Sequence, residues 1–313
     1  MMRFIAGRLM SGLLTIWFIA TATFFAMHAV PGDPLASEKA VSNEIRQSLE
    51  QRYGLDKPLL HQYGLYLSNM LQGDFGISYT QQNRSVNDII REHFPVSAWL
   101  GVAALSIATL GGVLLGAVMA LKRDHWLDYS IMIMIVFAIS VPGFVFAALA
   151  QFSILRLNEA TGLSLLPVAG WGELSHVWVP AWVLGLGTMA YIARLMRSSM
   201  LEVLATDYML TARAKGLTAW QVFLRHQCRN AILPVLTVLG PAIAAITTGG
   251  FVVEIIFAIP GLGRYFVQAV QALDYTVIMG TTVFYGAFLV LMVTVVDILY
   301  GIVDPRIRIG RSQ

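Results

Sequence analysis

The sequence is poor in cysteine and in charged residues. Cys228 is the single cysteine among 313 residues, which excludes an internal disulfide. Charged residues make up 12% of the chain, about half of their share in a typical soluble domain, and hydrophobic residues make up 57%. The mean hydropathy is +0.68. These values exclude an ordinary soluble domain and predict an integral membrane protein.

Motifs for catalysis and for metal binding are also lacking. The sequence contains no phosphate-cradling glycine loop and no nucleophile motif. The histidines do not fall at the spacing of metal ligands; they are His28, His61, His93, His125, His176 and His226. We therefore expect a chain that is not an enzyme and that carries no cofactor or metal of its own.

Long apolar runs dominate the sequence instead. A helix needs about 20 apolar residues to cross the hydrocarbon core of a bilayer, and the alternation typical of barrel strands is absent. The runs are Leu9 to Val30, Val96 to Leu121, Tyr129 to Leu155, Trp178 to Met196, Ile232 to Val253 and Val277 to Ile302. The predicted fold class is an all-α membrane protein with about six transmembrane helices.

The positions of lysine and arginine predict the orientation. With the N-terminus inside, most of the 21 basic residues are cytosolic, and the short external connections hold only Arg156 and Arg264. The cytosolic set is Arg3, Arg8, Lys122, Arg123, Arg194, Arg197, Arg213, Lys215, Arg225, Arg229, Arg306, Arg308 and Arg311. Both termini are therefore predicted to lie in the cytosol. A cleaved signal peptide is the alternative for the first run, but its length of about 22 residues favours a retained anchor.

The loop from Pro31 to Pro95 is then external and too long for a simple tether. An amphipathic helix is predicted in it from the spacing of Leu59, Tyr63, Tyr66, Leu67 and Met70. The loop is either a helical cap over the bundle or a vestibule cover that also meets a substrate-binding protein. A second external element is predicted from Pro260 to Asp274, with a helix around Phe266 to Ala272.

The segment from Asp207 to Pro234 is more structured than a plain connection between two spans would need to be. Thr206 and Asp207 are expected to cap one helix, which Gly216 ends in a left-handed conformation. Thr218 with Gln221 forms a capping-box pattern for a second helix. The segment thus predicts a helix, a sharp glycine turn and another helix on the cytosolic side.

Two roles fit this segment equally well on physical grounds. Small residues at Ala212, Ala214 and Gly216 let another protein approach the backbone, while Arg213 and Lys215 offer charge. The segment is then a docking knob for a partner protein. The alternative is an amphipathic helix that rests on anionic headgroups.

The order of the residues resembles one family. The stretch TARAKG, followed by RNAILP, is similar to the cytosolic loop of membrane subunits of bacterial ABC importers, especially those for peptides. In that family the loop holds a coupling helix that inserts into a cleft of the ATPase subunit. The resemblance implies ATPase coupling by Asp207, Ala212, Arg213, Ala214, Lys215 and Gly216. The broad family pattern has Glu-Ala before Ala212, and Leu210 and Thr211 replace that pair here, so no glutamate contact is implied.

Further short motifs along the chain look like signatures of the B-type membrane subunit of oligopeptide and dipeptide importers. They are Pro31 to Pro34, Tyr53 to Pro58, Gly73 to Gly76, Ile259 to Arg264 and Asp304 to Arg308. The resemblance implies the type I importer permease fold in the cytoplasmic (inner) membrane. It also implies four kinds of partner: a second related permease subunit, two ATPase subunits that bind ATP and Mg²⁺, an external peptide-binding protein and the lipid bilayer.

The division predicted on this basis has three parts. Residues 1–95 form the first helix and the external loop, residues 96–303 form the transporter core with a coupling segment at 197–231, and residues 304–313 form a cytosolic tail. Within the core, Gly112 and Gly116 form a small-xxx-small pair for helix packing. Pro142 with Gly143, Pro234 and Pro241 are expected to kink or begin helices.

Some polar and turn residues are candidates for structural or gating roles. Asp297 lies inside the sixth run and is costly there unless it is paired, and Arg194 is its expected partner. Glu254 is expected at the external interface, and Pro260, Gly261 and Gly263 form an external turn. Cys228 is expected to pack as a small residue. No residue is assigned to substrate contact.

Two alternatives to peptide import remain at this point. Related membrane subunits that share these motifs carry nickel chelates or glutathione. A secondary transporter or channel would need no ATPase, and inverted repeats with charges at the midplane would favour it.

Overall fold

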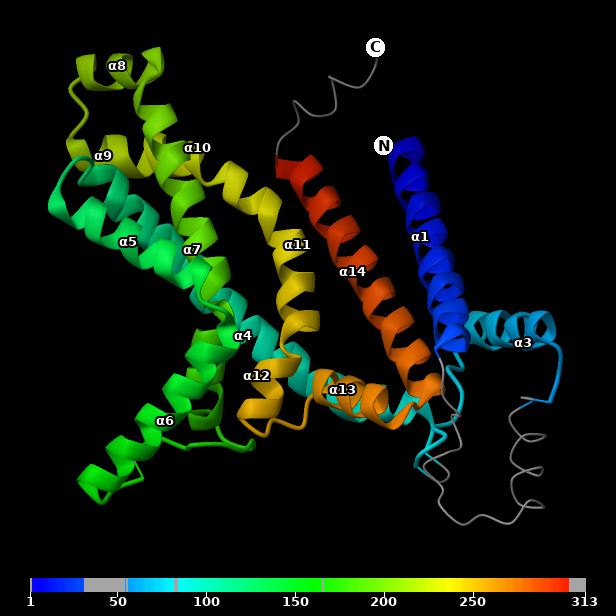
Figure 1. The fold of residues 1–313 in the computed structure, drawn as a ribbon. Coiled ribbons are helices and arrows are strands. Elements are labelled where there is room, and N and C mark those ends of the chain that lie inside the picture. Colours follow the sequence, from blue (N-terminus) through cyan, green and yellow to red (C-terminus); the bar gives the residue numbers. More distant parts are fainter. Residues whose placement is uncertain (1, 31–53, 55, 82–83, 165, 304–313) are drawn as a thin grey trace. The chain divides into compact units, whose positions relative to one another are not determined.

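The computed structural model describes residues 2–30, 54, 56–81, 84–164 and 166–303 (Figure 1). Within these ranges the chain is helical, and an isolated bridge between Ile77 and Ser85 is the only β-type pairing. The prediction of an all-α protein is confirmed. The motifs at Pro31 to Pro34 and Asp304 to Arg308, and Tyr53 and Leu55 of a third, lie outside the described residues.

Four described helices are long and apolar enough to cross a membrane: α1 (Met2–Ala29), α4 (Val86–Leu121), α7 (Ser175–Leu204) and α14 (Tyr275–Val303). The pair α5 (Trp126–Ser140) and α6 (Gly143–Thr161) would raise the number to five if it forms one bent span. The fifth predicted span corresponds to the shorter helix α11 (Leu233–Gly249), which is followed by α12 (Phe251–Ile256). The count of six spans therefore stays a prediction.

The third predicted span is broken where the sequence places Pro142. The chain bends by 104° between α5 and α6. The residue before proline is pushed out of the helical region, and Val141 accordingly has φ −90° and ψ 127°. The kink predicted at Pro142 and Gly143 is thus confirmed, and it is a sharp corner. Pro234, by contrast, stands in the first turn of α11, and Pro241 lies inside that helix.

Helix α4 begins ten residues before the predicted start of the second span, and Pro95 lies inside it. The Ser85 hydroxyl accepts a hydrogen bond from the Asp88 backbone N–H at 3.0 Å and donates to the Asp88 carboxylate at 2.6 Å. This reciprocal cap starts the helix at the external loop. In the sequence, this helix start is marked by Ser85 followed three residues later by the acidic Asp88.

The chain divides into two compact units. One comprises residues 1–97 and 260–294, and the other comprises residues 98–259 and 295–313. Helices α4 and α14 contribute to both. The predicted division at residues 95 and 303 remains a prediction.

The first unit carries the elements that the sequence predicts to be external. Helix α3 (Leu59–Leu71) confirms the predicted amphipathic helix, and its Tyr63 and Tyr66 rings pack against Phe24 of α1. Helix α13 (Leu262–Ala272) confirms the helix predicted after Pro260 and starts four residues earlier than expected; its external location stays a prediction. Its buried Leu262 and Ala269 pack on the first turns of α4 and α14.

The second unit is built around α7. A Cβ atom at Gly116 of α4 would lie 2.5 Å from the Ala193 carbonyl oxygen, so only glycine permits this approach of the two helices. Gly112 meets α7 in the same way, beside Ile192. The predicted packing role of this glycine pair is confirmed. After α7 come α8 (Asp207–Ala214), α9 (Ala219–Val222), the π-helical stretch η1 (Phe223–Cys228) and α10 (Arg229–Ala231).

Candidate functional site

The segment after α7 forms a helical unit, here called the knob and defined as residues 207–231. Helix α8 ends at Ala214, and Gly216 has φ +77°, a left-handed conformation that favours glycine. The backbone then turns directly into α9. The predicted helix, glycine turn and helix are confirmed.

The cap of the second helix is as predicted, whereas that of the first is not. The Thr218 side chain accepts from the Gln221 backbone N–H at 3.4 Å, and the Thr218 backbone N–H donates to the Gln221 side chain at 3.0 Å. The Thr206 hydroxyl instead donates to the Val203 carbonyl at 2.6 Å and caps no backbone donor of α8. The reason is that α7 ends only two residues earlier and leaves open carbonyls within reach. Asp207 forms the first turn of α8, where a negative charge suits the helix dipole.

The knob is packed tightly against the end of α7. Met209, Ala212 and Val222 are buried together, next to Val203 and Leu204. Ala212 is only 4% exposed, so it lies inside the knob and not on its outer surface, and its role in coupling stays a prediction. Its small side chain lets α8 pack closely on α9.

The second helix of the knob widens into the π-helical stretch η1. Gln227 of this stretch is buried and donates to the Met200 carbonyl of α7 at 3.4 Å. Cys228 packs beside buried Met200 and Ala231, in agreement with its expected packing role. Burial raises the pKa of the Cys228 thiol. Such π-helical widenings are frequent at functional sites.

The outer surface of the knob combines basic and apolar side chains. Five of the six predicted coupling residues are exposed: Asp207, Arg213, Ala214, Lys215 and Gly216. Leu210 is 65% exposed and Trp220 is 66% exposed, and the Trp220 ring stacks on Phe223 with centroids 5.5 Å apart. Large apolar side chains exposed beside arginine and lysine are typical of a binding surface.

A buried ion pair that the sequence reasoning missed joins α5 to α7 next to the knob. The Arg197 guanidinium donates to both carboxylate oxygens of Asp128, at 2.8 and 2.7 Å. Asp128 is 2% exposed, and it also accepts from the Asp124 backbone N–H. The available signal in the sequence was an aspartate and an arginine at the predicted cytosolic ends of two neighbouring apolar runs.

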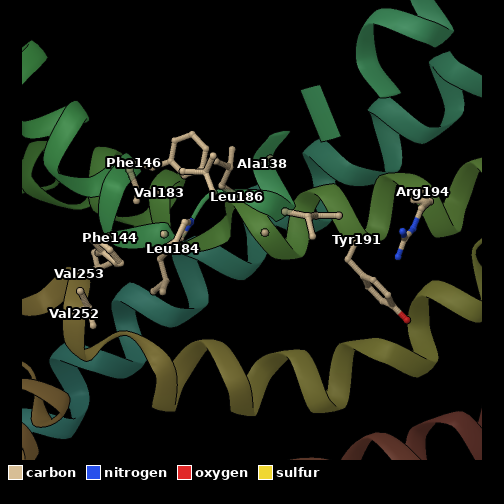
Figure 2. Close-up of a pocket in the computed structure, with 15 residues that line it drawn as sticks. Ala138, Phe144, Phe146, Val183, Leu184, Leu186, Tyr191, Arg194, Val252 and Val253 are labelled. Atoms are coloured by element: carbon tan, nitrogen blue, oxygen red, sulfur yellow. The ribbon is translucent and has the colours of Figure 1, made fainter. Parts of the chain in front are cut away.

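Arg194 lies one turn before Arg197 and lines a cavity of about 520 Å³ within the second unit (Figure 2). The cavity follows α7 and the corner between α5 and α6. The side chain of Asp297, its predicted partner, lies outside the described residues. Glu254 is 1% exposed and sits in α12, so it is buried rather than exposed at an interface.

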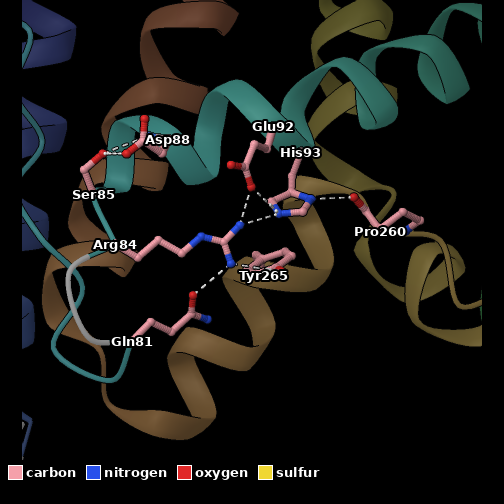
Figure 3. A network of polar contacts seen from close by, with 8 residues as sticks. All are labelled: Gln81, Arg84, Ser85, Asp88, Glu92, His93, Pro260 and Tyr265. Carbon is pink, nitrogen blue, oxygen red and sulfur yellow. Dashed lines mark hydrogen bonds and ion pairs between the residues drawn. The ribbon is translucent and has the colours of Figure 1, made fainter.

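The turn at Pro260, before α13, is held by a polar network in the first unit (Figure 3). His93 of α4 contacts the Pro260 carbonyl through Nδ1 at 2.9 Å, and its Nε2 lies 3.1 Å from Arg84. Arg84 pairs with Glu92 and lies over the ring of Tyr265, which stacks on His93. The hydrogen bonds to Tyr265 and Glu92 raise the pKa of Arg84 above the ordinary value of an arginine.

The rest of this turn is fixed by packing and by one more hydrogen bond. Gly261 precedes α13, Gly263 is buried, and the Leu262 backbone N–H donates to the Ser97 hydroxyl at 2.9 Å. The predicted turn residues therefore form a fixed connection within this unit. Buried Asp274, at the other end of α13, accepts from Ser78 and Thr80.

The described residues contain no group of three or more histidine, cysteine, aspartate or glutamate side chains placed to hold a metal ion. Of the predicted functional positions, the structure brings the coupling residues together on the knob. Within the second unit Arg194 lines the cavity and Glu254 is buried in α12, and within the first unit Pro260, Gly261 and Gly263 form the turn before α13.

Comparison with known proteins places the chain in a family. The family model for the binding-protein-dependent transport system inner membrane component matches residues 112–309, and the model for the N-terminal part of such membrane components matches residues 1–101. The chain belongs to this family. The predicted resemblance is thus confirmed, and this inner membrane component is a multi-pass protein with several apolar helices.

Relatives match the component from end to end. It is 45% identical over 312 residues to the dipeptide transport system permease protein DppB of Bacillus subtilis, covering 100% of each chain. It is 41% identical over 310 residues to the oligopeptide transport system permease protein OppB of Haemophilus influenzae, covering 98% of this chain and 100% of the relative. A solved amino acid ABC transporter is 18% identical with a TM-score of 0.49, covering 70% of this chain and 94% of that one.

Proposed function

We propose that this inner membrane component is the pore-forming permease subunit of an ATP-driven importer of dipeptides or oligopeptides. The observation that carries the proposal is the full-length match to a dipeptide transport permease at 45% identity. A match over the whole chain includes the external loop, the spans and the knob together. A shared helical core alone would not produce it.

The energy for import comes from separate ATPase subunits in this proposal. The sequence contains no phosphate-cradling loop, so ATP and Mg²⁺ are bound by the partner chains. The exposed part of the knob, Arg213 to Gly216 with Leu210 and Trp220, is the docking surface for one ATPase subunit. Burial of Met209, Ala212 and Val222 against the end of α7 supports this role, because a packed unit transmits a push to the helix that carries it.

The complete assembly then has two permease subunits, two ATPase subunits and an external peptide-binding protein. This subunit has six spans, with both termini and the knob in the cytosol and helices α3 and α13 outside. Closure of the ATPase pair rocks the helices and switches the pathway between inward-facing and outward-facing states. The binding protein delivers peptide on the external side.

Co-expression followed by affinity purification in mild detergent tests the assembly. We expect ATPase subunits to co-purify with the tagged chain, and the reconstituted complex with its binding protein to import labelled peptide only when ATP is present. A chain that purifies without an ATPase and carries solute without ATP would overturn the proposal. If the complex imports nickel chelates or glutathione in place of peptide, the proposed ATP-driven assembly stands and the proposed substrate is wrong.

A further inference from the structure

The cavity at the corner of α5 and α6 is apolar except at one end. Its walls are aliphatic and aromatic side chains of α5, α6, α7 and α12, including Phe144, Leu184 and Val253. Tyr191 and Arg194 of α7 lie at the opposite end from Phe144 and Val253 (Figure 2). Its volume of about 520 Å³ lies within the range of small-molecule sites, which is about 300 to 1,000 Å³.

Arg194 is the unusual residue of this cavity. Among the described residues it forms no ion pair, whereas Arg197 one turn further is neutralised by Asp128. Arg194 is exposed and lies near the end of the fourth apolar run that the charge distribution assigns to the cytosolic side, and an arginine there is retained where water or an anionic group reaches it. The cavity therefore presents a positive charge to whatever enters it, beside the phenol of Tyr191.

We propose that this cavity is a transmembrane binding site for the transported peptide, in which Arg194 binds the C-terminal carboxylate. The inference rests on the proposed function for its substrate class. A guanidinium makes two parallel hydrogen bonds to a carboxylate, and the Tyr191 hydroxyl can donate a third. The apolar walls hold the peptide side chains without hydrogen bonds of their own, which suits a carrier of peptides with varied sequences.

The dimensions of the cavity agree with a short peptide. Its lining on α7 runs from Val183 to Arg194, a rise of about 16 Å along a helix. An extended peptide spans about 3.3 to 3.6 Å per residue, so about four or five residues match this length. A dipeptide or a tripeptide fits with room for water beside it.

Photo-crosslinking of the purified transporter complex in nanodiscs, without the binding protein, tests the site. The probe is a tripeptide with a photoreactive central residue, used both as the free acid and as the C-terminal amide. We expect the free acid to crosslink to residues 141–144 and 183–194 by mass spectrometry. Arg194→Gln should lower its yield about ten-fold or more, because a charge-assisted pair is lost. Arg194→Lys should restore part of the yield, and the amide should give a low yield in all variants.

The matched control is Arg123→Gln, which removes the same charge from an exposed side chain in the turn after α4. Its crosslinking yield should equal that of the wild type. Thermal unfolding of each complex separates loss of the site from loss of the fold. If Arg194→Gln unfolds early, the comparison of acid and amide on the wild type still decides the matter.

Three results would overturn the site: free acid and amide that crosslink equally, crosslinks that map elsewhere, or a yield unchanged in Arg194→Gln. Native mass spectrometry that shows Arg194→Gln releasing a phospholipid, with peptide crosslinking unchanged, would assign the arginine to a lipid phosphate. Import by the wild-type complex is measured in parallel. If the wild-type complex imports peptide but shows no crosslinks at this cavity, only the binding site at Arg194 is refuted. If the complex imports no peptide at all, its role as a peptide importer is refuted.

Discussion

At the scale of single residues, the structure separates side chains that are exposed on the knob from side chains that hold the chain together. Ala212 and Ala214 look equivalent in the sequence, yet Ala212 is buried beneath α9 and Ala214 is exposed. Helical periodicity alone does not say which face of a short cytosolic helix meets its own neighbour. The packing of α8 on α7 and α9 decides it.

Ala214 and Gly216 test the docking surface. Ala214→Trp should leave the fold intact, because an exposed substitution changes the free energy of unfolding by only about 0.5 kcal/mol. It should lower the amount of peptide imported per ATP hydrolysed about ten-fold, in the range of a lost coupling free energy. Gly216→Pro should also lower the amount of peptide imported per ATP hydrolysed, because proline cannot adopt the φ of +77° that the turn between α8 and α9 requires. Reconstituted vesicles measure both quantities.

The control for this prediction is Lys122→Trp, which places the same bulk on an exposed residue of the turn after α4. Import and ATP hydrolysis should stay coupled in that variant. Full coupling in Ala214→Trp would show that the knob is not the contact for the ATPase.

The ion pair between Asp128 and Arg197 should matter for stability. Arg197→Met leaves the carboxylate of Asp128 buried without its counter-charge, at a cost of about 3 kcal/mol or more. Thermal unfolding in detergent should show a clearly lower midpoint. The double variant Asp128→Leu with Arg197→Met should recover most of the loss, because no buried charge remains. Equal midpoints for the wild type and Arg197→Met would mean that the pair contributes little.

The thiol of Cys228 should react slowly with maleimides. Burial raises its pKa, so a smaller fraction is the reactive thiolate at pH 7 to 8, and its labelling rate should keep rising at a pH above the ordinary cysteine range. A cysteine at the exposed position 220, made as Trp220→Cys in a Cys228→Ala background, serves as the reference. Stopped-time labelling across pH gives both profiles, and coincident profiles would contradict the packing described for Cys228.

At the scale of elements, the helices follow the sequence pattern and their corners follow proline and glycine. The break at Pro142 was predictable because the backbone of Val141 is restricted by the following proline, but its 104° angle was not. The early start of α4 at Val86 was missed because the apolar run that predicted the span begins only at Val96. Pro95 lies in the third turn, and the cap formed by Ser85 and Asp88 outweighs it.

Gly116 tests the contact between α4 and α7. Gly116→Ala places a methyl group 2.5 Å from the Ala193 carbonyl and should destabilise the protein by about 1 to 3 kcal/mol through overpacking. Gly187→Ala is the matched control on α7, because a Cβ atom there has no neighbour within 4 Å. Its unfolding midpoint should be unchanged or slightly higher, since alanine favours a helix. Equal effects of the two substitutions would argue against a close approach at Gly116.

At the scale of the whole molecule, the distribution of charge predicts the orientation. Single cysteines in a Cys228→Ala background should react with a membrane-impermeant maleimide from outside at Gln72→Cys, after α3. Trp220→Cys on the knob should react only after the membrane is opened. Both side chains are exposed, so access and not burial sets the result. The reverse pattern would invert the topology and remove the knob from the reach of a cytosolic ATPase.

The sequence by itself determined the membrane class, the all-α fold class, the glycine turn at Gly216 and the family, because hydropathy, φ restrictions and residue order are local properties. Only the tertiary structure decided that Asp128 pairs with Arg197, that Ala212 turns inward, and that Tyr191 and Arg194 share one end of a cavity. These features depend on which helix faces come together. That choice is made by close packing over side chains far apart in the chain.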